Sequence, residues 1–221
     1  MEAFDMLRAI ASDARVEPYL VACDGNRRAA VRLYAWNIQI SAAFQASLGC
    51  LEVACRNAMH HELSGLFGRE DWWRAPELRL HYVADRIVTD AVDVISRRRE
   101  RQTPGRIVAE LPFGFWVSLL GSGADYETRL WRPALRHAFP GYRGRRTPLH
   151  QELDDGRRLR NRIAHHEPIY GRDLVKDHER TLRLLTHISA DYAAWVRGHD
   201  RVPDVLAARD DVCSGALLAR F

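Results

Sequence analysis

Residues 27–67 read RRAAVRLYAWNIQISAAFQASLGCLEVACRNAMHHELSGLF, and this stretch decides the fold. It contains no proline, and its apolar residues recur at steps of three and four positions: Leu33, Trp36, Ile40, Phe44, Leu48, Leu51 and Cys55. That spacing places them on one face of an α-helix. The stretch therefore predicts one very long helix, or two helices that meet near Gly49.

The helical pattern continues along the rest of the chain. Further helices are predicted over about 76–101, from Pro104, over about 125–138, over about 147–165 and from Asp173 to about 196. Pro104 and Pro148 each follow a threonine, the order that favours a helix start. Few segments alternate with period two, so strands are not expected. We predict an all-α fold: one helical-bundle domain over residues 1–221, with long helices, additional short helices and a short tail from about 203.

The composition is that of a globular protein. The chain has 221 residues, of which 47% are hydrophobic and 28% charged, and these values exclude wholesale disorder and a collagen-like repeat. Lys+Arg 33 against Asp+Glu 29 gives a net charge of +4, which does not by itself indicate a polyanionic partner. Lys176 is the only lysine. Codon bias explains most of this arginine preference, although arginine also binds phosphate bidentately.

The cysteines and the N-terminus indicate the compartment. Cys23, Cys50, Cys55 and Cys213 have no zinc-ligand spacing, and no cofactor or metal is expected. The first residues lack a secretory apolar segment, and no apolar run approaches the roughly 18 residues of a membrane span. We expect a soluble, cytoplasmic protein with no membrane partner.

Two segments, residues 56–61 and 160–165, share the order Arg-Asn followed by a histidine five positions after the arginine. In the second, Asn161 and His165 share a helix face, and Arg160 lies about 140° from His165 around an ideal helix. A guanidinium beside an imidazole suits cleavage of a phosphodiester. The arginine stabilises the charge that develops on the phosphate, and the histidine moves protons. This chemistry requires no metal.

The second segment resembles the Arg-x(4 to 6)-His signature of ribonucleases of the HEPN superfamily, with the polar Asn161 after the arginine. Several stretches of the chain are similar to the Abi-like (abortive infection) protein family. They are residues 36–44 (WNIQISAAF), 51–58 (LEVACRNA), 113–120 (FGFWVSLL) and 159–169 (LRNRIAHHEPI), and the resemblance spans roughly residues 30–190.

The resemblance implies an all-helical HEPN-type fold and a ribonuclease that acts in phage defence or as the toxin of a toxin–antitoxin pair. It implies RNA as the ligand, as substrate or as a small antitoxin RNA, and a homodimer in which two motifs meet. Arg160 would bind the scissile phosphate, Asn161 would position it or the histidine, and His165 would be the acid/base. His166 and Glu167 follow the signature and are secondary candidates.

Arg56, Asn57 and His61 form a second group of candidates. Glu52 lies four residues before Arg56, so an ion pair within the helix would give Arg56 a structural role. The functional alternative is that Arg56, Asn57 and His61 line the same RNA cleft as the Arg160 segment. Arg160 and His165 also have a structural alternative, because cations at a helix end interact with the last carbonyl groups.

A third group of candidates lies in the arginine-rich loop around residue 143. Arg143, Arg145 and Arg146, like the run over residues 97–101, belong either to a solvated surface or to an RNA-phosphate track. Two other functions remain open at this point: a non-catalytic RNA-binding protein held by a small RNA, and a protein-interaction module.

Overall fold

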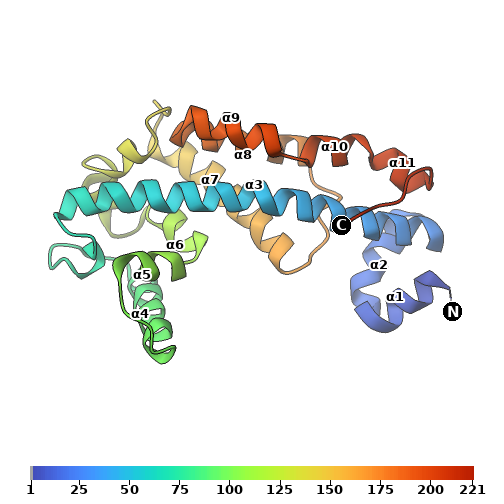
Figure 1. The fold of residues 1–221 in the computed structure, drawn as a ribbon, viewed down its shortest axis with the longest axis horizontal. Coiled ribbons are helices and arrows are strands. Elements are labelled where there is room, and N and C mark those ends of the chain that lie inside the picture. Colours follow the sequence, from blue (N-terminus) through green and yellow to red (C-terminus); the bar gives the residue numbers. More distant parts are fainter. Residues whose placement is uncertain (1) are drawn as a thin grey trace. The chain divides into compact units, whose positions relative to one another are not determined.

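The computed structural model describes residues 2–221, and every regular element among them is a helix (Figure 1). The predicted all-α fold is therefore confirmed. Residues 27–67 form one continuous helix, α3 (Arg27–Phe67), and not two that meet at Gly49.

The chain divides into two compact units. Unit 1 comprises Met1–Gly49, Arg158–Thr181 and Val196–Phe221, and unit 2 comprises Cys50–Arg157 and Leu182–Trp195. Four helices contribute residues to both units: α3, α7 (Arg146–Ala164), α8 (Leu174–Ile188) and α9 (Ala190–His199). The single domain expected over residues 1–221 stays a prediction, since the structure divides the chain into two compact units.

Unit 1 packs both chain ends against the first part of α3. It contains α1 (Ala3–Ala11), α2 (Asp13–Ala22), α10 (Val202–Ala207) and α11 (Arg209–Ser214). Trp36, Ile40 and Phe44 of α3 are completely buried in its core. The indole N–H of Trp36 donates to the carbonyl of Val205 (3.0 Å), so the C-terminal tail is docked beside α3 (Figure 1).

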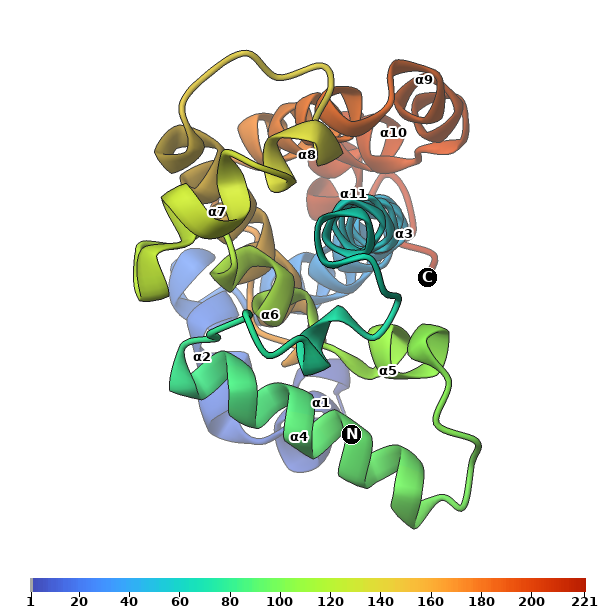
Figure 2. The same ribbon diagram turned by 90° about the vertical axis from the view of Figure 1, so that its left-hand side faces the viewer.

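Unit 2 contains the second part of α3 and three shorter helices, α4 (Tyr82–Arg97), α5 (Pro104–Glu110) and α6 (Phe113–Ser118), which Figure 2 shows near one another. Its core is rich in aromatic rings. Trp72 packs against Phe115 and Trp116, with ring centroids 6.3 and 6.1 Å away. The indole N–H of Trp72 donates to Nδ1 of His60 (3.0 Å), which ties this cluster to α3.

Three predicted helix boundaries were wrong. The helix expected from about 76 begins only at Tyr82, after an irregular segment that contains Pro76. The helix expected over 125–138 is broken into short 3₁₀ and π turns, and Pro133, which lacks an N–H, lies within that region. The last long helix is interrupted at Ser189, whose hydroxyl accepts from the backbone N–H of Tyr192 (3.2 Å) and caps α9.

The expectation that no segment matches a membrane span needs correction for α3. By length and mean hydropathy alone this helix could cross a membrane. Polar residues such as Asn37 and Gln45 interrupt its apolar stretch, but the average stays apolar. Core helices of soluble proteins meet the same criteria, so this is weak evidence for a membrane. The largest apolar side chains of α3 are buried in the protein.

Candidate functional site

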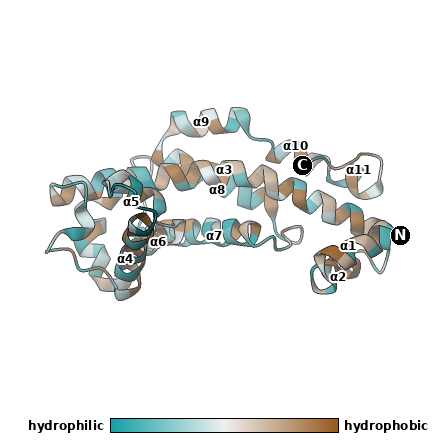
Figure 3. Ribbon diagram, turned by 60° about the horizontal axis from the view of Figure 1, so that its bottom comes forward, coloured by the Kyte–Doolittle hydropathy of each residue, from teal (hydrophilic) through white to brown (hydrophobic). Residues whose placement is uncertain are grey.

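The Arg160 segment lies at the C-terminal end of α7, which is mostly hydrophilic in Figure 3. The helix ends in a Schellman turn, in which the N–H groups of His166 and Glu167 donate to the carbonyls of Ile163 (2.9 Å) and Arg162 (2.8 Å). His166 adopts the left-handed conformation that this turn requires, with φ of +55°. The helix therefore stops within the motif, before its histidine pair.

Arg160 and His165 leave α7 in different directions. Arg160 and Asn161 are half-buried residues of the last turns, whereas His165 is exposed just beyond the last helical residue. The backbone N–H of His165 still donates to the carbonyl of Asn161 (2.9 Å), so helical geometry holds that far. At 3.6 residues per turn, Arg160 and His165 are about 140° apart. The helix thus places Asn161 and His165 on a common face and turns Arg160 toward another.

Two polar anchors fix the segment that follows His166. Asn37 is only 4% exposed. Its Oδ1 atom accepts hydrogen bonds from the N–H groups of Ile169 (2.8 Å) and Tyr170 (3.1 Å). The guanidinium of Arg15 on α2 donates to the carbonyl of His166. The backbone after the motif is consequently held against the core of unit 1.

Arg162 and Glu167 close the same turn from the solvent side. Arg162 donates to the carbonyl of Pro168 (2.8 Å) and lies 3.4 Å from a carboxylate oxygen of Glu167. Glu167 is exposed and paired with an arginine of its own turn. It therefore stabilises the helix end.

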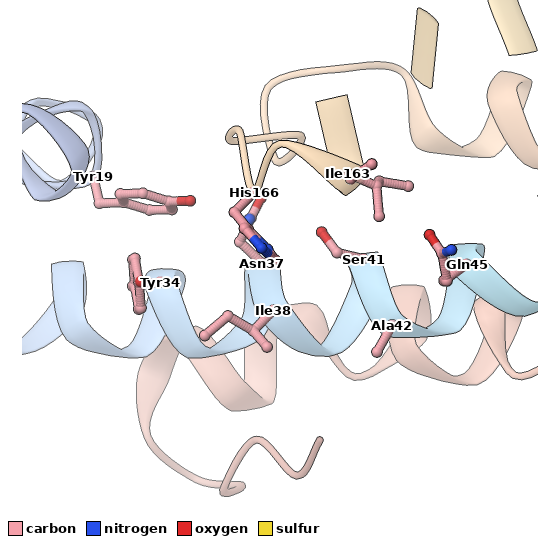
Figure 4. Close-up of a pocket in the computed structure, with 10 residues that line it drawn as sticks. Tyr19, Tyr34, Asn37, Ile38, Ser41, Ala42, Gln45, Ile163 and His166 are labelled. Carbon is pink, nitrogen blue, oxygen red and sulfur yellow. The ribbon is translucent and has the colours of Figure 1, made fainter. Parts of the chain in front are cut away.

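A cavity of about 440 Å³ adjoins the end of α7 within unit 1 (Figure 4). Figure 4 shows Tyr19 entering from α2, His166 reaching toward α3 beside Asn37, and Ser41 and Gln45 directed from α3 toward the α7 side. The other lining residues come from the same segments: Tyr34, Ile38, Ala42, Ile163 and Ala164. His166, the secondary candidate, therefore lines the cavity, and His165 does not.

Three tyrosines form the α2 end of this site. The ring of Tyr19 lies 5.1 Å from that of Tyr34 and 5.0 Å from that of Tyr170, and Tyr19 is 1% exposed. Burial, together with the neighbouring Tyr34 and Tyr170 hydroxyls, raises the pKa of Tyr19 well above its ordinary value. Its hydroxyl therefore stays protonated and available as a hydrogen-bond donor.

Sequence reasoning missed this cavity, although α3 carried a signal for it. Asn37, Ser41 and Gln45 recur every fourth residue in an otherwise apolar helix, which places three polar side chains in one row. The row faces the end of α7, a packing that spacing alone does not reveal.

Arg56, Asn57 and His61 lie on α3 within unit 2. Arg56 is half-buried, and its Nη1 donates a long hydrogen bond to the carbonyl of Ala109 (3.4 Å), while its Nε is buried without a partner. Asn57 and His61 are exposed. The histidine with a defined partner in this segment is His60, which accepts from Trp72.

The arginine-rich loop separates into two kinds of residue. Arg143 and Arg145 are exposed. Arg146 is only 12% exposed, its Nε lies 2.7 Å from Oε2 of Glu127, and its Nη1 contacts the carbonyls of Leu120 and Gly121. Arg146 therefore holds the turn over residues 120–127, and Arg143 and Arg145 are the members of this group that solvent reaches.

Within residues 2–221, no three His, Cys, Asp or Glu side chains come together as a metal site. Comparison of the chain with protein-family models, with curated proteins and with solved structures finds no match in any of the three.

Proposed function

We propose that this protein is a metal-independent endoribonuclease of the HEPN type, an Abi-like effector of phage defence or a toxin that acts in the cytoplasm. The observation that carries the proposal is the position of Arg160-Asn161-x-x-x-His165 at an exposed helix end beside a preformed cavity. Solvent reaches His165 there, so a long single strand can approach it. The sequence resemblance described above supports the same assignment.

The proposed reaction is attack by the ribose 2′-hydroxyl on the adjacent phosphorus. The bond from the 2′-oxygen to phosphorus forms as the bond from phosphorus to the 5′-oxygen of the next nucleotide breaks. A histidine takes the proton of the 2′-hydroxyl, and an acid returns a proton to the leaving 5′-oxygen. Arg160 binds the non-bridging oxygens and stabilises their developing charge. The products are a 2′,3′-cyclic phosphate and a 5′-hydroxyl.

The divergence of Arg160 and His165 on α7 favours a dimeric site. One imidazole does not reach both sides of one phosphorus, and the two side chains of a single helix point in different directions. In a two-fold symmetric dimer, each motif would supply what the other lacks. We therefore include a homodimer in the proposal, with Asn161 positioning His165 on their common face.

The same divergence favours one rival, a protein that binds RNA through Arg160 without cutting it. Such a protein would retain RNA during purification, with affinity that falls steeply as salt is raised. It would release no fragments.

Incubation of the purified protein with a defined single-stranded RNA in EDTA tests the proposal. We expect fragments that carry 2′,3′-cyclic phosphate and 5′-hydroxyl ends, identified by mass spectrometry. Folded His165→Ala and Arg160→Ala proteins should produce none, whereas Arg86→Ala, a change at an exposed arginine of α4 outside the candidate groups, should cut normally. Full cleavage by folded His165→Ala protein would overturn the catalytic assignment, and binding without any fragments would favour the rival.

A further inference from the structure

The cavity beside α7 combines flat apolar walls with a row of polar groups. Tyr34 presents an aromatic ring, and Ile38 and Ile163 present aliphatic side chains. The ring of Tyr19 packs edge-on against Tyr34 and is only 1% exposed. Ser41 places a hydroxyl between these walls, with Gln45 one helical turn further along α3 (Figure 4). The volume of about 440 Å³ lies within the range of about 300–1,000 Å³ that is typical of small-molecule sites.

Several polar groups of the cavity have unused hydrogen-bonding capacity. Within residues 2–221, the side chains of Tyr19, Ser41, Gln45 and His166 neither donate nor accept a hydrogen bond. Asn37 differs, because its Oδ1 is committed to the backbone of the following segment. A ligand in the cavity would therefore meet a donor from Tyr19, a hydroxyl from Ser41 and an amide with both donor and acceptor from Gln45.

The charge of the lining restricts the kind of ligand. No Asp, Glu, Lys or Arg is among the residues that line the cavity, and His166 is the only titratable group besides the tyrosines. A buried phosphate or ammonium group would lack a counter-ion there. The part of a ligand that enters is thus uncharged, planar enough for the aromatic walls, and polar along one edge.

The proposed phosphate-binding arginine does not line the cavity, but it lies on the helix face that borders it. Arg160, Ile163 and Ala164 follow the i, i+3, i+4 spacing of one helix face, and the last two line the cavity. A nucleotide whose phosphate meets Arg160 would direct its base along this face toward the cavity. In single-stranded RNA the bases are free to unstack and enter such a site.

We propose that this cavity binds the base of a nucleotide that flanks the scissile phosphate of the RNA. Binding of that base would set the base preference of cleavage. The proposal rests on the endoribonuclease function proposed above and names its specificity site. The ring of Tyr34 contacts the base, and Ser41, Gln45 and the Tyr19 hydroxyl bind its polar edge.

Calorimetric titration of the protein with each of the four free ribonucleosides tests the cavity without any RNA cleavage. We expect at least one nucleoside to bind the wild-type protein. The double variant Ser41→Ala/Gln45→Ala should bind it about tenfold more weakly or worse, because two hydrogen bonds to the base are lost. Ala42→Phe should block the cavity, and since Ala42 is exposed, the larger side chain does not have to enter the core. The matched control is Ser122→Ala/Gln151→Ala, the same two changes at exposed positions of unit 2, which should bind as the wild type does.

Sequencing of the cut sites in a randomised RNA separates this inference from the proposed function. We expect a base preference next to the cut that becomes flatter in Ser41→Ala/Gln45→Ala and is kept in the control variant. Two results would overturn the cavity proposal and leave the endoribonuclease standing. In the first, the protein cleaves RNA but binds no nucleoside. In the second, it cleaves RNA, and the folded cavity variants keep both the nucleoside binding and the base preference of the wild type. Nucleoside binding that the cavity variants abolish, without any RNA cleavage, supports the cavity and overturns the endoribonuclease.

Discussion

The two Arg-Asn segments, residues 56–61 and 160–165, have the same spacing and different structures. The first lies inside α3, which continues to Phe67, so every residue of the segment is helical. The second runs off the end of α7 at Ala164. His61 and His165 are both exposed, so the difference lies in the next residue: beyond the helix end, His166 turns into a cavity.

The comparison shows that the environment, more than the spacing, decides what an Arg-Asn-His pattern can do. In the first segment Arg56 contacts the carbonyl of Ala109, and the tryptophan cluster uses His60. These are packing roles. In the second segment a cavity lies beside the motif and a fixed turn follows it, and this is why we propose the second segment as the binding site. The following predictions test this distinction.

The largest expected difference is catalytic. His165→Ala should lower the rate of RNA cleavage by roughly 10²- to 10⁴-fold, the usual contribution of a general acid or base. His61→Ala, the corresponding change in the first segment, should leave the rate within about threefold, because a surface histidine outside the site contributes no proton transfer. Initial rates on one fluorescent RNA measure both.

Thermal unfolding of each variant provides the control for folding, since both histidines are exposed and neither change should lower the melting temperature appreciably. Equal loss of cleavage in the two variants would break the comparison. It would place both segments in one RNA cleft, the alternative left open by the sequence.

The next effect concerns the anchor of the second segment. Asn37→Ala removes the acceptor of two backbone N–H groups, and leaves that of Ile169 buried and that of Tyr170 partly buried without a partner. We expect the free energy of unfolding to fall by about 2–4 kcal/mol, given about 1–3 kcal/mol for each unsatisfied group. Asn57→Ala, at an exposed asparagine of the same helix, should change it by less than about 0.5 kcal/mol. Urea denaturation compares the two, and equal destabilisation would show that Asn37 is no special anchor.

Much of the fold was predictable because it depends on local pattern. The periodicity of residues 27–67 fixed α3 to its observed ends, and Thr103-Pro104 marked the start of α5. The broken helices were not predictable from periodicity. The apolar periodicity continues before and after Ser189, so the pattern gives no sign of the break between α8 and α9. That Ser189 caps α9 is seen only in the structure.

The candidate site was predictable only in part. The motif's place at the end of a helix followed from Pro168, but the Schellman turn and the left-handed His166 did not, because glycine is the residue normally expected there. The cavity depends on α2 and α3 meeting α7, contacts between residues far apart in the sequence such as Tyr19 and Ile163. That His166 lines the cavity and His165 does not could therefore be learned only from the structure.

A third prediction uses His60, the half-buried histidine of the first segment. Burial lowers the pKa of His60 below its ordinary value, so the folded state favours the neutral ring that accepts from Trp72. As the pH falls below about 6.5, the unfolded chain takes up this proton first, and stability is lost until the lower pKa of the folded state is passed. His60→Gln keeps an acceptor that does not titrate.

Unfolding free energies at about pH 7.5 and about pH 5 measure this effect. We expect a larger loss on acidification in the wild type than in His60→Gln. His165→Gln, a change at the exposed histidine of the second segment, should lose as much stability as the wild type. His150 and His187, whose pKa values burial also lowers, contribute equally to all three proteins. A loss as large in His60→Gln as in the wild type would mean that protonation of His60 is not coupled to folding.

The smallest expected effect has opposite signs in the two segments. His166 holds φ of +55°, a conformation that costs a residue other than glycine about 1 kcal/mol. Glycine avoids this cost but is more flexible in the unfolded chain, which offsets part of the gain. His166→Gly should therefore raise the free energy of unfolding by about 0.5 kcal/mol. His61 is helical, and His61→Gly should lower it by about 0.3–0.5 kcal/mol. Paired denaturant titrations resolve this difference in sign. If both variants are destabilised, and His166→Gly more so, then the contacts of the His166 ring in the cavity outweigh the backbone cost. The ring itself would then be the reason that a histidine, and not a glycine, ends α7.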